Sequence, residues 1–241
     1  MSGTVIILGA GSPNGVGGAL ARRFAAQGHH VIVTGRTLDK VATVAEQVTA
    51  AGGSAEAMQV DVTSEADQDR LFSESAAKGP IAAVLYNAGN NAIIPFEDLS
   101  TELMNDFMRV GFFGAFLAAK RAIPILKGQG RGSLFFTGAS ASLRGKANFA
   151  HFAAAKGALR NLAQALAREF GPAGVHVAHF IIDGIIDGEK ARTGFPEYLE
   201  SLGEGGVLEP DAIAEAFWFA HQQPPSAWTH EMDLRPQREN W

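Results

Sequence analysis

Short apolar runs alternate with longer amphipathic stretches along most of this chain. The short runs are rich in β-branched and aromatic residues and end at glycine or polar residues, which is typical of buried strands in a parallel sheet. On this pattern strands are predicted at 5–8, 30–34, 55–60, 81–86, 132–137 and 175–182. A last edge strand is predicted within 226–234.

Between the apolar runs, hydrophobic residues recur at helical spacing and the stretches end at helix-stop signals such as Gly28 and Gly52. Helices are predicted at 17–27, 38–51, 65–77, 100–126, 149–170 and 210–221. One continuous alternation of strand and helix predicts an α/β fold: a doubly wound, Rossmann-like parallel sheet with helices on both faces. We expect a single domain over 1–241, with a less regular segment at 187–206.

A glycine-rich turn separates the first predicted strand from the first predicted helix. Free backbone N–H groups and the helix dipole favour an anion at such a turn, so a phosphate site is predicted there. The common G-x-G-x-x-G spacing is not met, because Asn14 stands where its third glycine would be. The residues expected to surround the phosphates are Gly11, Ser12, Asn14, Gly15, Val16 and Gly17.

Ligands of doubly wound sheets bind beyond the carboxyl ends of the strands, so the residues there are candidates for cofactor contacts. Arg36 and Thr37 follow the second strand, where an arginine accommodates the 2′-phosphate of NADP and an acid would select NAD. A solvated loop arginine is the alternative interpretation. Asp61 and Val62 follow the third strand, where the aspartate would meet the adenine amino group or simply cap the next helix.

Composition excludes several other classes of protein. The chain has 241 residues, 46% of them hydrophobic, a net charge of −5 and no cysteine. Disulfides, thiolate metal sites and a nucleic-acid surface are therefore not expected, and the histidines show no metal-binding spacing. No apolar run reaches the ~18 residues of a membrane span, and the N-terminus shows no signal sequence. A cytoplasmic protein with no metal and no membrane partner is expected.

The pieces in order resemble the short-chain dehydrogenase/reductase family along nearly the whole chain. The matching pieces are Gly11-x3-Gly15-x-Gly17, Asp61-Val62, Asn87-Ala88-Gly89 and Lys156 on a long helix. The resemblance implies NAD(P)-linked interconversion of a carbonyl and an alcohol, commonly in a dimer or tetramer. It also implies cofactor contacts at Asn87, Ala88, Gly89, Lys156, Gly184 and Ile186.

The departures from the family pattern cluster where protons are handled. Phe152 stands at the position of the family's tyrosine, whose hydroxyl exchanges a proton with the substrate oxygen, and a phenylalanine has no such proton. Ala139 and Gly111 fall at the positions of the family's serine and asparagine. After the sixth strand, Asp183-Gly184 replaces Pro-Gly, and Asp187 falls where a threonine often sits.

Two functions remain open at this point. The first is an oxidoreductase that favours NADP(H), with NAD(H) possible, in which Lys156 works with a substitute proton donor among Ser140, Ser142 and Tyr198. His151 should point elsewhere, because it lies roughly 100° around the helix from Phe152. The second is a binding protein, a sensor or scaffold, that keeps the cofactor and has lost the chemistry.

Two further expectations concern surfaces. The segment 187–206 should cover a substrate that the sequence does not identify. The long helices 100–126 and 149–170 carry more apolar and small residues than one buried stripe needs, which predicts a homodimer or homotetramer through them. The alternating C-terminal stretch that ends in Trp241 also indicates an interface.

Overall fold

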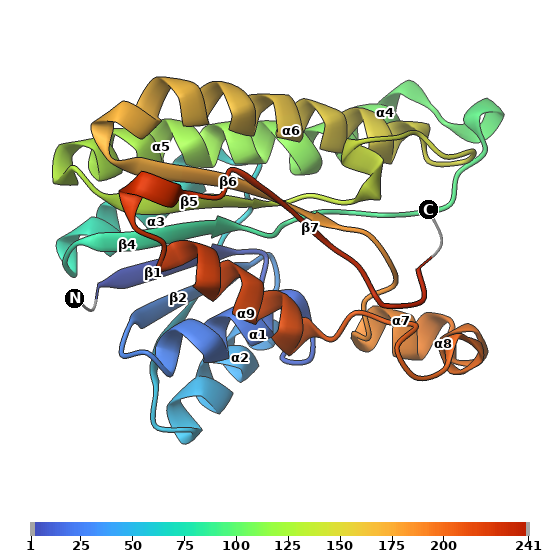
Figure 1. The fold of residues 1–241 in the computed structure, drawn as a ribbon, viewed down its shortest axis with the longest axis horizontal. Coiled ribbons are helices and arrows are strands. Elements are labelled where there is room, and N and C mark those ends of the chain that lie inside the picture. Colours follow the sequence, from blue (N-terminus) through green and yellow to red (C-terminus); the bar gives the residue numbers. More distant parts are fainter. Residues whose placement is uncertain (1–2, 240–241) are drawn as a thin grey trace.

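Seven parallel strands form one sheet in the order β3-β2-β1-β4-β5-β6-β7, so the predicted doubly wound fold is confirmed (Figure 1). The structure is a computed structural model, which describes residues 3–239. The strands are β1 (Thr4–Leu8), β2 (His30–Gly35), β3 (Ser54–Gln59), β4 (Ile81–Tyr86), β5 (Gly132–Thr137), β6 (Val175–Ile182) and β7 (Glu231–Leu234). Strand order reverses between β1 and β4, which makes that point of the sheet the expected ligand crevice.

Helices cover both faces of the sheet because each strand turns alternate apolar side chains to opposite sides. In β1, Val5 and Ile7 pack against α1 (Val16–Ala25), α2 (Leu38–Ala50) and α9 (Pro210–His221). Ile6 and Leu8 pack beneath α3 (Glu65–Ala77), α5 (Gly114–Gln129) and α6 (Ala150–Phe170). Figure 1 shows these two helical layers below and above the sheet.

The predicted helix at 100–126 is wrong in one respect, because it is interrupted. It consists of α4 (Thr101–Met108), a π-helical turn (Arg109–Phe113) and α5. A π turn breaks the regular backbone ladder, and the hydroxyl of Tyr86 donates a 2.6 Å hydrogen bond to the carbonyl of Val110 within it. Burial of that hydroxyl raises the pKa of Tyr86, which stays protonated as the donor.

Two other segments differ from the expected elements. The irregular segment 187–206 contains two short helices, α7 (Glu189–Gly194) and α8 (Pro196–Leu202). The last strand is shorter than expected, because the 3-10 turn Pro225–Ala227 occupies its predicted start. Further 3-10 turns lie at Phe96–Asp98, Ser140–Ser142 and Gly171–Ala173. Trp241, with its expected interface, lies outside the described residues.

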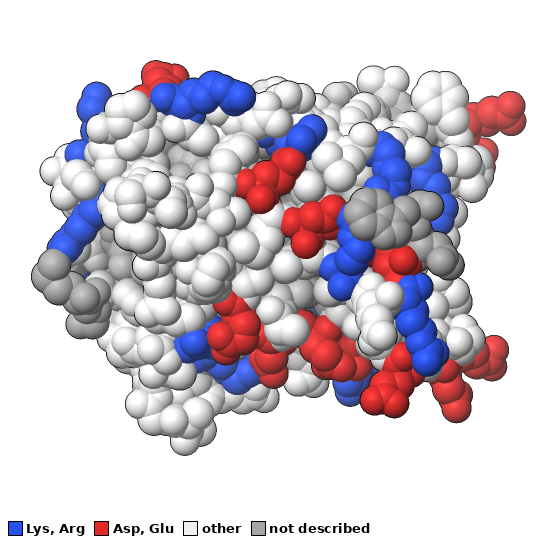
Figure 2. All heavy atoms as spheres, viewed as in Figure 1, with Lys and Arg blue, Asp and Glu red and all other residues white. Residues whose placement is uncertain are grey.

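Charged side chains of both signs intermingle near the carboxyl ends of the strands, at the right of Figure 2. The amino-end half of that face carries fewer charges, and neither sign dominates the view. A surface of this kind offers no continuous basic track for a nucleic-acid backbone on this face. Within residues 3–239, no helix combines the length and apolar character needed to cross a membrane.

Candidate functional site

The glycine turn after β1 is closely packed, and two of its glycines are required by backbone contacts. Gly9 has a φ of +99°, and a Cβ there would lie 2.6 Å from the Cα of Ala88. A Cβ on Gly17 would lie 2.6 Å from the carbonyl oxygen of Gly9. These contacts seat α1 directly on the turn and bring the ends of β1 and β4 together.

The same turn leaves an open cradle in front of α1. A Cβ on Gly11 would meet nothing within 4 Å, and Gly15, the N-cap residue of α1, supplies no side-chain cap. The first turn of α1 carries no acidic residue, so its N–H groups face outward without a competing negative charge. Free N–H groups, a helix N-terminus and open space fit a pyrophosphate group. Of the predicted residues, Gly11, Ser12, Asn14 and Gly15 lie in the turn, whereas Val16 and Gly17 are buried in the first turn of α1.

The residues after β2 and β3 flank the cradle on one side. Arg36 is exposed, and among the described residues its guanidinium has no hydrogen-bond or ion-pair partner. Thr37 is the N-cap residue of α2. Asp61 accepts hydrogen bonds from the backbone and hydroxyl of Thr63. The helix cap that follows is Ser64, so the alternative interpretation of Asp61 as a cap is wrong.

Asn87 ties together the ends of the three central strands. Its amide nitrogen donates a 2.8 Å hydrogen bond to the carbonyl of Gly9, and its amide oxygen accepts one of 3.0 Å from the hydroxyl of Thr137. Its backbone N–H donates to the carbonyl of Leu8. The amide therefore fixes Ala88 and Gly89 beside the glycine turn, where the sequence placed them.

Lys156 reaches the same point from α6. Its ammonium donates a 2.6 Å hydrogen bond to the carbonyl of Thr137, and a Cβ on Gly89 would lie 3.6 Å from its nitrogen. The residue is only 5% exposed, and burial lowers the pKa of Lys156 to about 8. An ammonium of this pKa titrates near neutral pH, where it can exchange a proton or stabilise a nearby negative charge.

Phe152 lies one helical turn before Lys156, as the spacing predicts, with the ammonium 5.8 Å from the centre of its ring. Its side chain is half-buried. His151 turns away and packs against Phe107 at 4.1 Å between ring centres, as predicted. The family's asparagine would not fit at Gly111, because even a Cβ there would lie 2.8 Å from the Cβ of Ala155.

The two candidate serines occupy different environments in the 3-10 turn that follows β5. Ser142 is buried, and its hydroxyl accepts a hydrogen bond from the backbone N–H of Ala139 and lies 3.2 Å from Nε2 of His179. Ser140 is half-buried, and within residues 3–239 its hydroxyl has no hydrogen-bond partner. Over the described residues, the hydroxyl of Ser140 is therefore unbonded, whereas that of Ser142 is engaged.

Two acidic residues after β6 are held by salt bridges. Asp183 is buried and pairs with Arg144 at 2.9 Å and with Arg235 at 3.6 Å. Asp187, at the position where the family often has threonine, binds the guanidinium of Arg192 with both oxygens. Arg144 and Arg235 are distant from Asp183 in sequence, whereas Arg192 lies five residues after Asp187, on α7.

Gly184 and Ile186 connect β6 to the covering segment. Gly184 has a φ of +150°, and a Cβ on it would lie 2.6 Å from Pro236. Ile186 forms an isolated parallel bridge with Leu208. The segment 187–206 contacts the loop after β4, since the ammonium of Lys190 donates a 2.7 Å hydrogen bond to the carbonyl of Asn91. Tyr198 on α8 is 53% exposed.

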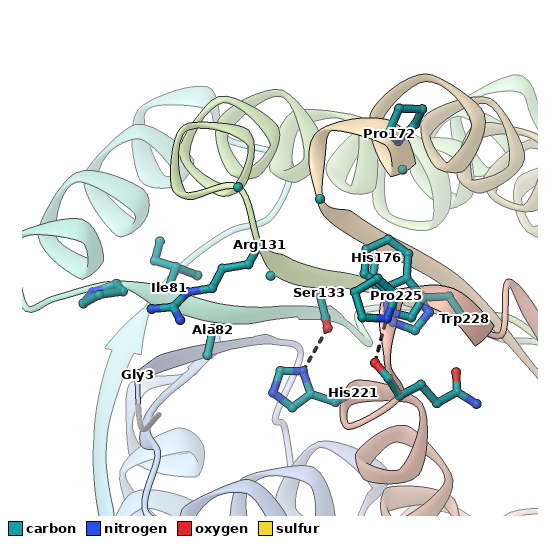
Figure 3. Close-up of a pocket in the computed structure, with 16 residues that line it drawn as sticks. Gly3, Ile81, Ala82, Arg131, Ser133, Pro172, His176, His221, Pro225 and Trp228 are labelled. Carbon is teal, nitrogen blue, oxygen red and sulfur yellow. Dashed lines mark hydrogen bonds between the residues drawn. The ribbon is translucent and has the colours of Figure 1, made fainter.

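A second hollow lies at the opposite edge of the sheet, where the strands begin (Figure 3). It is a cleft of about 670 Å³ between the starts of β4, β5 and β6 and the turn before β7. Ser133 and His221 line it, 2.8 Å apart. This cleft is separate from the glycine turn and from Lys156, so it is not the cofactor site. Over the described residues, no cluster of three or more metal-binding side chains occurs.

Comparison with known proteins agrees with this geometry. The family model for short chain dehydrogenases matches residues 3–193. Among curated proteins, the uncharacterized oxidoreductase YuxG of Bacillus subtilis is 34% identical over 86% of this chain, which spans 30% of the length of that relative.

Solved structures show the same likeness over the whole fold. A short-chain dehydrogenase from Rhodopseudomonas palustris is 33% identical, with a TM-score of 0.84 over 97% of this chain and 98% of that one. A protein from Beutenbergia cavernae, solved with NADP at low occupancy, is 27% identical, with a TM-score of 0.84 over 96% and 94% of the two chains.

Proposed function

The chain belongs to the short-chain dehydrogenase family, and on this basis we propose that it is an NADP(H)-dependent oxidoreductase acting on a carbonyl or alcohol. We propose further that the hydroxyl of Ser140 replaces the missing tyrosine as the group that exchanges a proton with the substrate oxygen. Relatives such as YuxG are named as oxidoreductases, which favours catalysis over a silent binding protein.

One observation carries the proposal: Lys156 remains in a working position although the tyrosine before it is absent. Its ammonium is buried against Gly89 and Thr137, and α6 packs against the turn that carries Ser140. Burying a lysine ammonium costs free energy unless the charge is used or well paired. Beside a phenylalanine ring in place of a phenol, this charge is available to a substrate oxygen as well as to the cofactor.

The residues divide the work as follows. The glycine cradle binds the pyrophosphate, Arg36 meets the 2′-phosphate and Asn87 holds the backbone against which the cofactor lies. When bound, the nicotinamide supplies or accepts the hydride. Ser140 donates its proton to the oxygen of the reduced carbonyl and regains one from water, since it is half-buried. Lys156 stabilises the negative charge that develops on that oxygen.

The other candidate donors are less suitable. The hydroxyl of Ser142 is buried and already bonded to Ala139 and His179. Tyr198 is largely exposed on α8. A donor must stand within hydrogen-bond reach of the substrate oxygen, and a free hydroxyl on the turn beside α6 is better placed for this than a surface phenol.

The test is a pair of substitutions at one position. Ser140→Ala should lower kcat for carbonyl reduction on the order of 10²-fold while the Kd for NADPH stays within about twofold. Ser140→Thr should keep most of the activity, because it keeps the hydroxyl. Unchanged kcat in Ser140→Ala would remove Ser140 from the mechanism. Normal NADPH binding with no reduction by the unaltered protein would favour the binding-protein alternative.

A further inference from the structure

A line of polar side chains, buried at Ser142 and His179 and partly exposed at Glu231 and Arg160, contacts the turn that carries Ser140. At its centre is His179 on β6, whose ring is completely buried. Nε2 of His179 lies 3.2 Å from the hydroxyl of Ser142, and Nδ1 lies 3.1 Å from a carboxylate oxygen of Glu231 on β7. Both ring nitrogens of His179 are therefore hydrogen-bonded to side chains.

The line ends on α6, the helix that also carries Lys156. Arg160, one turn after Lys156, donates two hydrogen bonds to the carboxylate of Glu231, of 2.6 and 2.7 Å. A two-bond arginine–carboxylate pair fixes direction as well as distance. Ser142, His179, Glu231 and Arg160 therefore join the turn, two strands and the catalytic helix in one connected unit.

The protonation states give each bond in this line a definite direction. Hydrogen bonds from Arg160 hold the pKa of Glu231 below its usual range, and burial lowers the pKa of His179 to about 4. At neutral pH the ring is therefore neutral, with Nδ1–H donating to the Glu231 carboxylate. Nε2 is then the acceptor, so the hydroxyl of Ser142 donates to it and in turn accepts from the N–H of Ala139.

The ring of His179 also sets how closely the turn approaches the sheet. A Cβ on Gly138 would lie 2.2 Å from Nε2 of His179, so the backbone of the turn rests directly on the imidazole. The backbone N–H of Gly138 donates to the carbonyl of Phe180, the next residue of β6. The turn is thus supported by β6 through the ring of His179 and the adjacent backbone.

We propose that His179 is a positioning residue for catalysis: by holding Ser142 it fixes the turn 139–142, and with it the free hydroxyl of Ser140, relative to Lys156. This inference rests on the proposed function, because it assigns the line of contacts to the placement of the proton donor. His179 itself is enclosed by Gly138, Ser142 and Glu231 and acts through the turn without touching substrate.

Two substitutions of His179 separate the two halves of the line. The side-chain amide of glutamine can replace Nε2, so His179→Gln keeps an acceptor for Ser142 and loses the bond to Glu231. The amide of asparagine can replace Nδ1, so His179→Asn keeps the bond to Glu231 and leaves Ser142 without its acceptor. If the bond to Ser142 positions the turn, glutamine should preserve function and asparagine should not.

We expect His179→Asn and Ser142→Ala each to lower kcat for carbonyl reduction by about tenfold or more, because a displaced catalytic group costs rate steeply. The Kd for NADPH should stay within about twofold, since the glycine cradle is untouched. Amide hydrogen exchange in 138–143 should speed up in both variants. His179→Gln should stay within about threefold of the unaltered protein in kcat, because it retains the acceptor that holds the turn.

The matched control is a second serine–histidine pair, formed by Ser133 on β5 and His221 on α9. Ser133 at the start of β5 lies 2.8 Å from Nδ1 of His221, at the opposite edge of the sheet (Figure 3). Ser133→Ala removes a serine–histidine hydrogen bond of 2.8 Å, shorter than the 3.2 Å of the Ser142–His179 pair, far from the cofactor cradle and should leave kcat unchanged. It shows how much any loss in Ser142→Ala owes to general destabilisation.

The outcomes separate this inference from the proposed function. Unchanged kcat in His179→Asn, equal losses in the asparagine and glutamine variants, or unchanged exchange in 138–143 would each overturn the positioning role. If the unaltered protein reduces no carbonyl, the proposed function fails and the catalytic assignment of His179 fails with it. The hydrogen-exchange data would then still show whether the ring of His179 holds the turn. Failure of the proposed function and failure of the positioning role can therefore be told apart.

Discussion

Phe152 has no hydroxyl proton to exchange with a substrate, but the residues around it keep polar and charged groups close by. Lys156 is buried one turn away, and Asn87 and Thr137 hold the backbone beside it. On the adjacent turn, the hydroxyl of Ser140 has no hydrogen-bond partner among residues 3–239. At the scale of single residues, this arrangement supports our proposal that another hydroxyl replaces the tyrosine while the lysine charge is kept. Predictions at this scale concern the charges that meet the cofactor and the substrate.

Arg36 should decide the choice between the two nicotinamide cofactors. Its exposed guanidinium has no partner within residues 3–239 and stands after β2, where a 2′-phosphate would bind. We expect Arg36→Ala to raise the Kd for NADPH on the order of 10- to 100-fold and to leave the Kd for NADH nearly unchanged. A charge-assisted phosphate contact contributes about 1.5–3 kcal/mol to binding. Fluorescence titration with both cofactors measures this, and equal weakening of both would contradict it.

Lys156 should impose an upper pH limit on reduction. Because burial lowers its pKa to about 8, the ammonium is lost as the pH rises through that value, well before an exposed lysine would lose its proton. We expect kcat/KM for reduction to fall about tenfold per pH unit above about 8. In Lys156→Arg the charge persists to a much higher pH, so any remaining activity should not show this decline. If kcat/KM of the unaltered protein stayed constant up to pH 10, the ammonium of Lys156 would have no role in reduction.

At the scale of elements, the departure at Gly111 has a packing reason. The π turn brings α4 and α5 so close to α6 that Gly111 faces Ala155 without room for a side chain. Tyr86 supports the turn from below by donating to the carbonyl of Val110. Glycine at position 111 thus lets these helices pack closely.

We expect Gly111→Ala to lower the free energy of unfolding by about 1–3 kcal/mol, because its Cβ would lie 2.8 Å from that of Ala155. The matched control is Gly128→Ala on α5, where a Cβ would meet nothing within 4 Å. That substitution should raise stability by about 0.5–1 kcal/mol through helix propensity. Urea unfolding compares the two, and the double variant with Ala155→Gly should recover part of the loss. Equal effects at 111 and 128 would refute the packing argument.

At the scale of the whole molecule, periodicity was sufficient to predict the fold. Apolar runs and helical spacing placed β4, β5, β6, α3 and α9 at the bounds that the structure has. Glycines and polar residues after the strands gave the cofactor side, because the carboxyl ends of parallel strands converge at one edge. These signals are local in sequence, and their consequences follow from the geometry of the sheet.

The parts that could not be predicted depend on contacts between distant residues. Nothing near His179 in the sequence identifies Glu231 or Ser142 as its hydrogen-bond partners. A histidine inside a fully buried strand does indicate that such partners exist, because buried polar groups are normally hydrogen-bonded. The π turn is set by how α6 packs, which the periodicity of 100–126 does not contain. The helices α7 and α8 are short and weakly patterned, so the same segment was expected to be irregular.

Exposed phenylalanines on the outer helix layer support the predicted oligomer. Phe113 and Phe116 are 50% and 37% exposed, one on the π turn and one on α5. We propose that they contact a second copy of the chain, since large exposed aromatic side chains mark association surfaces. We expect light scattering at micromolar concentration to give at least a dimer and Phe113→Lys to reduce its mass. A monomer, or a loss of mass only in Phe219→Lys on α9, would contradict this interface.

The most direct test of the central claim is hydride transfer itself. With NADPH deuterated at the transferred position and a broad carbonyl panel, we expect mass spectrometry to find an alcohol that carries one deuterium. Phe152→Tyr should raise the yield on the order of tenfold, and combining it with Ala139→Ser should raise it further, because the two hydroxyls restore the family's donor and its hydrogen-bond partner. If neither the unaltered protein nor the double variant labels any product while both bind NADPH, the protein is a cofactor-binding protein and not an oxidoreductase.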